Sequence, residues 1–248
     1  MNQVKLKIAG VVVEINTIYL NDFDVFNSFI TDNNKTDIII NITPEDISKA
    51  KERIIQEYGE ITNWNGYFEM YAILQKISES LISYNTVLIH GAAIAFRNSA
   101  FLFTAPSGTG KTTHVMKWLH QLSNAFVING DKPFIHFNNP AGKALVYGSP
   151  WAGKEKMYEN VNVPLDSIII MERSVNNHIH QISFEEAFPN LLHAVYWPDG
   201  KDEKRIVVEL INQFSHIVKF WHFQFNNFEN DCFSVAYSAL CPQPDIEH

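Results

Sequence analysis

The sequence predicts an α/β fold, and three observations support this prediction. Short apolar segments rich in β-branched and aromatic residues, which are typical of buried strands, recur from about residue 84 onward. Segments with apolar residues at helical spacing lie between and after them. The chain has 248 residues, of which 46% are hydrophobic and 19% charged, so it can bury a large core and is not disordered.

Residues 1–85 are predicted to form a small, β-rich α+β N-terminal lobe. Residues 4–16 read as a hairpin or two short strands around a glycine, and residues 36–43 form a β-branched run. A helix is expected over residues 43–59, which begin with Thr-Pro-Glu. Residues 63–85 carry apolar side chains close to helical spacing, which predicts a second helix.

Residues 86–248 are predicted to form a second, larger domain. Its buried strands are expected at residues 86–96, 99–105, 125–130, 143–149 and 167–172. Its helices are expected at residues 112–122, 183–195 and 203–217, followed by a strand at 216–225 and a last helix up to Leu240. Within the second of these helices, Pro189 marks a start or a kink.

Charge and cysteine usage exclude several classes of protein. The chain has 19 Lys and Arg against 27 Asp and Glu, and its formal charge of −8 argues against a dedicated nucleic-acid binder. No apolar run approaches the roughly 18 residues of a membrane span, and the N-terminus does not resemble a signal peptide. Cys232 and Cys241 make a weak case for a disulfide, so we expect a cytoplasmic protein. A homo-oligomer is compatible with the sequence.

The most specific motif is FLFTAPSGTGKTTHVMKWL, an apolar strand that leads through a glycine-rich loop into an amphipathic helix. Gly110, Lys111 and Thr112 match the end of the phosphate-loop pattern G-x-x-x-x-G-K-[ST], while Ala105 replaces its first glycine. Gly108 and Gly110 allow backbone N–H groups to approach a phosphate closely. The alternative is a glycine-rich turn that only joins a strand to a helix.

This motif predicts ATP and Mg²⁺ as cofactors. Lys111 would place a cation on the β- and γ-phosphates, and Thr112 would offer its hydroxyl group to Mg²⁺. The residues predicted to bind the nucleotide are Ser107, Gly108, Thr109, Gly110, Lys111, Thr112 and Thr113.

Two segments on either side of the loop carry further candidate residues. His90 ends an apolar strand and precedes Gly91, although lone histidines are more often satisfied in a core. Asp131 ends another apolar strand about 20 residues after the loop, where a carboxylate would approach the metal and the γ-phosphate. A simple Asp turn is the alternative for Asp131.

The segments HGAAIAF, APSGTGKTT and INGDKPFI, in this order, resemble the catalytic domain of HPr kinase/phosphorylase. The stretches YGSPWAGKE and VPLDSIIIMERS resemble smaller HPr-kinase-like proteins that are encoded with peptide-modification systems, including those for lasso peptides. The resemblance covers roughly residues 86–198. It implies an HPr-kinase-like, phosphoenolpyruvate-carboxykinase-like catalytic core, although the carboxykinases themselves are much longer than this chain.

The resemblance also implies roles for individual residues. Lys111 would act on the phosphates during transfer. Asp131 would take or orient the proton of the attacking hydroxyl group and, with Thr112, contact the metal. His90 would lie beside this carboxylate and tune it. The bifunctional enzymes have two adjacent aspartates where this chain has Gly130 and Asp131, which puts the reverse phosphorolysis activity in doubt.

Polar residues further along the chain are candidates for substrate contacts. The segment SPWAGKE adds Trp151, Lys154 and Glu155. A lysine near the nucleotide could stabilise charge on the transferred phosphoryl group, and Glu155 could bind a second Mg²⁺ or the substrate. An exposed turn with a charge pair is an equal alternative. Glu172 and Arg173 end a strand, where α/β sheets bind ligands, but a solvated charge pair fits them equally well.

These residues lead to three candidate functions. The leading prediction is an ATP- and Mg²⁺-dependent phosphotransferase with an alcohol group as acceptor, which phosphorylates a serine of a ribosomally made precursor peptide. The first alternative is a kinase for a small alcohol such as free serine or a sugar. The second is a non-catalytic, nucleotide-binding regulatory or assembly protein.

Overall fold

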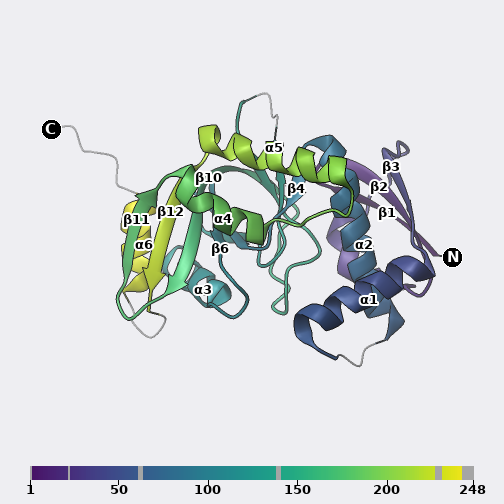
Figure 1. The fold of residues 1–248 in the computed structure, drawn as a ribbon, viewed down its shortest axis with the longest axis horizontal. Coiled ribbons are helices and arrows are strands. Elements are labelled where there is room, and N and C mark those ends of the chain that lie inside the picture. The colour runs from purple at the N-terminus through teal and green to yellow at the C-terminus, as the bar shows by residue number, and fades with distance from the viewer. Residues whose placement is uncertain (1, 22, 61–63, 138–140, 227–230, 242–248) are drawn as a thin grey trace.

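Two β-sheets organise the computed structural model, which describes residues 2–21, 23–60, 64–137, 141–226 and 231–241. One sheet has three strands and the other nine. Figure 1 shows the small sheet at one end of the molecule and the helices and strands of the C-terminal half at the other. The predicted α/β class is therefore confirmed. The division into an N-terminal lobe of residues 1–85 and a second domain of residues 86–248 stays a prediction.

The small sheet contains β1 (Asn2–Ile8), β2 (Val11–Thr17) and β3 (Ile38–Asn41). β1 and β2 pair antiparallel as the predicted hairpin, and Ala9 and Gly10 in its turn both have positive φ angles, as a type I′ hairpin turn requires. β3 joins β2 in parallel after the 3-10 helix η1 (Asp24–Phe29).

Two helices cover this sheet: α1 (Pro44–Tyr58) and α2 (Asn65–Leu81), the latter followed by the 3-10 turn η2 (Ile82–Tyr84). Thr43 and Asp46 form a capping box at the start of α1, which explains why the Thr-Pro-Glu signal predicted this helix correctly. The core under α2 continues into the large sheet, because Leu88, Phe134 and Trp151 belong to the same buried cluster.

The large sheet is built around one long strand. In order across the sheet, the strands are β4 (Thr86–Leu88), β8 (Phe134–His136), β9 (Leu145–Tyr147), β10 (Asn162–Arg173), β6 (Ser99–Thr104), β5 (Ala92–Phe96) and β7 (Phe126–Asn129). β12 (Lys219–Phe225) pairs with β10 in parallel and with β11 (His178–Ile182) antiparallel. β10 pairs antiparallel with β9 near its start and parallel with β6 and β12 further along.

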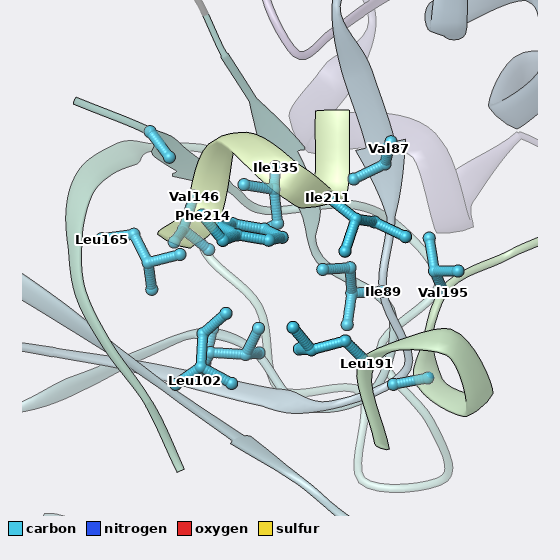
Figure 2. Packing of buried hydrophobic residues seen from close by; sticks show 14 of the residues in the cluster. Val87, Ile89, Leu102, Ile135, Val146, Leu165, Leu191, Val195, Ile211 and Phe214 are labelled. Atoms are coloured by element: carbon cyan, nitrogen blue, oxygen red, sulfur yellow. The ribbon is translucent and has the colours of Figure 1, made fainter. Parts of the chain in front are cut away.

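Helices cover both faces of this sheet. They are α3 (Lys111–Gln121), α4 (Phe184–Ala194), α5 (Lys201–Ile217) and α6 (Cys232–Leu240). Alternate residues of β10 point to opposite faces: Ile168 and Ile170 pack with α4 and α5, whereas Ile169 and Met171 pack with α3 and α6. Figure 1 shows α5 crossing the molecule above the sheet. Figure 2 shows side chains from α4, α5 and the strands converging in the core on the face of the sheet that α4 and α5 cover.

Some sequence-based expectations differ from the structure. Residues 86–96 form two strands, β4 and β5, with His90 between them. β8 and β11 were not predicted, and Pro189 lies inside α4 rather than at its start.

Both cysteines are free and buried. None of the helices in the described ranges is long and apolar enough to cross a membrane.

Candidate phosphate-binding site

The glycine-rich loop connects the end of β6 to the start of α3. Gly108 and Gly110 have φ angles of 77° and 116°, in the left-handed region that favours glycine, and Gly110 is the N-cap of α3. Ala105, which replaces the first glycine of the pattern, is not among the residues with positive φ. Its Cβ is therefore compatible with the loop, and the backbone has the predicted strand–loop–helix arrangement.

Lys111 lies over the start of its own loop. Its side chain is largely buried, and Nζ donates hydrogen bonds to the carbonyl oxygens of Ala105 at 2.8 Å and Pro106 at 3.3 Å. Burial lowers the pKa of Lys111 below its ordinary value of 10.5, while the charge of Asp131 opposes that shift. The ammonium group is thus held at the loop, where the predicted phosphate contact requires it.

A pocket of about 300 Å³ lies at this loop. It is lined by His90, Ser107, Gly108, Gly110, Lys111, Thr112, Thr113, Gly130, Asp131 and Arg173. Six of the seven residues predicted to bind the nucleotide line it. The exception is Thr109, whose hydroxyl group donates to the carbonyl of Pro106 within the loop.

Asp131 and His90 meet at the edge of this pocket although they are distant in the chain. His90 Nε2 lies 3.3 Å from Asp131 Oδ1, and Lys132 Nζ lies 2.5 Å from Asp131 Oδ2. The backbone supports this contact, because the N–H group of Gly91 donates to the carbonyl of Asp131. Each carboxylate oxygen of Asp131 therefore has a nitrogen partner. Of these two partners, the sequence predicted His90 but not Lys132.

These partners determine the charge state of Asp131. Burial acts to raise its pKa, but the hydrogen bond with His90 and the charge and hydrogen bond of Lys132 outweigh burial. Together they hold the pKa of Asp131 well below its usual range. The carboxylate is therefore ionised at neutral pH and suited to holding a cation or orienting a hydroxyl group.

A buried amide fixes the turn that carries Asp131. Asn129 is fully buried at the end of β7, and its Oδ1 accepts hydrogen bonds from the N–H groups of Asp131 at 2.9 Å and Lys132 at 2.6 Å. Its Nδ2 donates to the carbonyl and hydroxyl oxygens of Ser149 at 2.9 and 3.0 Å. Asn129 was not among the residues predicted from the sequence. An Asn followed by Gly-Asp is a turn signal that could have indicated it.

The SPWAGKE segment packs beside this turn, and its residues have different surroundings. Trp151 is only 8% exposed; its ring contacts Phe26 edge-on and Nε1 donates to the carbonyl of Met70. This burial in the core shared with the N-terminal lobe argues against the predicted substrate contact for Trp151. Lys154 and Glu155 are exposed and do not line the pocket.

Gly153 brings this segment close to Asp131. Its φ angle is 76°, and a Cβ atom there would lie 3.3 Å from Asp131 Cβ and 3.9 Å from Glu155 Oε2. The backbone at Gly153 therefore lies close to the side chain of Asp131.

Glu172 and Arg173 end β10 but have separate surroundings. Glu172 Oε2 lies 3.0 Å from His222 Nε2 and accepts from Gln224 on the neighbouring strand β12. Arg173 instead lines the pocket and donates to the phosphate loop. Both residues are exposed, as the solvated alternative predicts, but only Arg173 lines the pocket.

The donor set fits a nucleotide phosphate and Mg²⁺. Thr112 and Asp131 provide a hydroxyl and a carboxylate oxygen on one pocket, and Mg²⁺ in phosphoryl-transfer sites binds one or two carboxylates together with phosphate oxygens. Within the described ranges, no group of three or more His, Cys, Asp or Glu residues could hold a metal ion by itself. A bound phosphate would complete the coordination of the ion.

Known proteins offer little direct comparison. No family model matches the chain, and no curated protein matches it. Solved structures do match, among them the HPr(Ser) kinase/phosphatase from Coxiella burnetii, with 9% sequence identity and a TM-score of 0.36. That match covers 61% of this chain and 95% of the other. A likeness of this size carries no inference about activity.

Proposed function

We propose that this protein is an ATP- and Mg²⁺-dependent kinase that transfers the γ-phosphoryl group of ATP to a hydroxyl group, and that its acceptor is a serine of a ribosomally made precursor peptide. One observation carries the proposal: a single pocket combines the phosphate loop, Lys111 and the Asp131–His90 pair. Such a combination suits phosphoryl transfer, in which the protein mainly positions the reactants and stabilises charge.

The phosphate loop and the start of α3 provide the phosphate site. Backbone N–H groups near a helix N-terminus favour anions, and Lys111 adds a positive charge. Thr112 and Asp131 would hold Mg²⁺, which neutralises charge on the β- and γ-phosphate oxygens when it is bound.

Asp131 also has a role toward the acceptor. Because its carboxylate remains ionised, it can accept a hydrogen bond from the attacking hydroxyl group and orient it toward the phosphate. The contact with His90 Nε2 limits the movement of this carboxylate. Both side chains are partly exposed, at 24% for Asp131 and 34% for His90, so a substrate can reach them.

The peptide acceptor is the more specific part of the proposal. The pocket of about 300 Å³ is at the lower end of the range for small-molecule sites. An acceptor that inserts one side chain from outside, as a peptide serine does, suits this space. The resemblance of SPWAGKE and SIIIMERS to peptide-modifying members of the kinase group supports the same acceptor.

Transfer of label from γ-labelled ATP to a precursor peptide encoded by a neighbouring gene tests the proposal. The matched variants are Asp131→Asn, which keeps the side-chain shape, and Asp202→Asn, an exposed control on α5. We expect Asp131→Asn to lower turnover by about 10²- to 10⁴-fold and to leave ATP affinity nearly unchanged. The control should keep full activity.

Other outcomes identify the alternatives. Label on free serine or a sugar, with none on peptides, would identify a small-alcohol kinase. Tight ATP binding with no transfer to any hydroxyl acceptor would contradict the kinase proposal and favour a nucleotide-binding regulatory protein.

A further inference from the structure

Arg173, the last residue of β10, contacts the glycine-rich loop between β6 and α3. Its Nε donates to the carbonyl of Thr109 at 2.9 Å, and one terminal nitrogen donates to the carbonyl of Gly108 at 2.6 Å. The side chain also lines the pocket. The guanidinium group of Arg173, from β10, thus binds two consecutive carbonyl groups of the loop that precedes Lys111.

The sheet register explains how this contact forms. β6 and β10 run parallel, and the last partners in their register are Thr104 and Ile170. β6 ends there and turns into the loop, whereas β10 continues to Arg173, which adds roughly 10 Å of strand at about 3.3 Å per residue. This extension places the guanidinium group level with the glycine-rich part of the loop.

We propose that Arg173 is a positioning residue, which holds the phosphate loop in the conformation that binds the nucleotide. The inference rests on the proposed nucleotide site and adds a residue to it. The peptide group is planar and trans, so a carbonyl group and the N–H group of the next residue point in opposite directions. When Arg173 holds the carbonyl of Thr109, it therefore also fixes the direction of the Gly110 N–H group.

The chemistry of the side chain suits this role. A guanidinium group has several donors in a rigid fork and can bind two carbonyls at once, whereas a lysine ammonium group cannot reproduce that geometry. Hydrogen bonds that involve a charged group are stronger than neutral ones. The adjacent carboxylate of Glu172 is directed to His222 and Gln224 on β12.

Three variants test this inference: Arg173→Ala, Arg173→Lys and the control Arg205→Ala. Arg205 lies on α5 with a side chain that is 76% exposed and pairs only with its helical neighbour Glu209 in the described contacts. Dissociation constants for fluorescent ATP and ADP analogues, kcat and KM, and thermal unfolding are measured for each protein.

We expect Arg173→Ala to weaken ATP and ADP binding by the same factor, about 10- to 50-fold, because the loop holds phosphates that both nucleotides share. KM for ATP should rise more than kcat falls. Arg173→Lys should recover only a small part of the affinity. Unfolding temperatures should stay close to that of the wild type, since the guanidinium group is exposed, and Arg205→Ala should bind normally.

Three results of the binding measurements would overturn the inference. They are unchanged nucleotide affinity in Arg173→Ala, a loss confined to ATP, which would indicate direct contact with the γ-phosphate, and full rescue by lysine, which would show that charge alone matters. Amide hydrogen exchange at Gly110 in the free protein separates this inference from the proposed function. Faster exchange in Arg173→Ala supports the anchoring role even if the wild type binds no nucleotide, and unchanged exchange contradicts it.

Discussion

Replacing Asn129 by alanine tests whether the turn that carries Asp131 depends on one buried amide. The substitution removes four hydrogen bonds, two accepted from the N–H groups of Asp131 and Lys132 and two donated to Ser149. Asn129 is fully buried, so water does not freely replace these bonds. We expect both the fold and the position of Asp131 to be affected.

The size of the effect follows from these contacts. A hydrogen bond contributes about 1 kcal/mol net, and each buried partner left unsatisfied costs about 1–3 kcal/mol. Ser149 Oγ also donates to the carbonyl of Lys132, so part of the network survives. We therefore expect a loss of roughly 3 kcal/mol in the free energy of unfolding, which lowers Tm by about 6–12 °C for a chain of this length.

Urea unfolding and thermal unfolding measure this loss, with Asn212→Ala on the exposed face of α5 as the control. A double-mutant cycle with Ser149→Ala should give a coupling energy of about 0.5–3 kcal/mol, since the two side chains are in direct contact. A loss below about 1 kcal/mol in Asn129→Ala, or additive effects in the cycle, would refute the reasoning.

Three further predictions concern Lys111, His114 and Trp151. Lys111→Ala should abolish phosphoryl transfer and weaken ATP binding, and unchanged activity would show that the loop is misinterpreted. Burial, and to a lesser extent the charge of Lys117, lowers the pKa of His114 from 6.5 to about 3, so its stabilising contribution is complete above pH 6.5 and is lost as pH falls toward 3. The free energy of unfolding, measured by urea titration, should rise by up to about 1.4 kcal/mol per pH unit between pH 3 and 6.5. In His114→Gln this rise should be smaller, and equal slopes in the two proteins would contradict the prediction. Trp151→Ala should cost about 3–5 kcal/mol in urea unfolding and change the Kd for ATP by less than about threefold, whereas a large loss of affinity in a stable variant would restore the substrate role.

The features that the sequence predicted well are local. The hairpin turn at Ala9 and Gly10, the capping box at Thr43 and the glycine-rich turn between β6 and α3 each depend on residues that are neighbours in the chain. At Gly108 and Gly110, glycine is favoured because the backbone adopts positive φ, and that requirement is visible in the sequence pattern itself.

The features that the sequence did not predict depend on distant contacts. The run from 86 to 96 is mostly apolar and was predicted as strand, yet the chain turns at Gly91, where a Cβ atom would lie 2.9 Å from the carbonyl oxygen of Phe103. Trp151 reads as a candidate for binding because nothing near it in sequence shows that Phe26 and Met70 enclose it. Arg173 reaches the loop only because the register of β6 and β10 places it there.

The net charge of −8 raises the question of how such a chain could attract a polyphosphate. Among the described residues, the pocket lining includes Lys111 and Arg173 but only one carboxylate, Asp131, whose two oxygens are partnered by His90 and Lys132. The positive groups around the pocket therefore outnumber the negative ones, although the whole chain is acidic. Field lines concentrate in such a cleft, so the local excess of cations, rather than the net charge, governs the encounter with an anionic ligand. Raising the ionic strength should slow nucleotide association, and this dependence should weaken when Arg173 is removed.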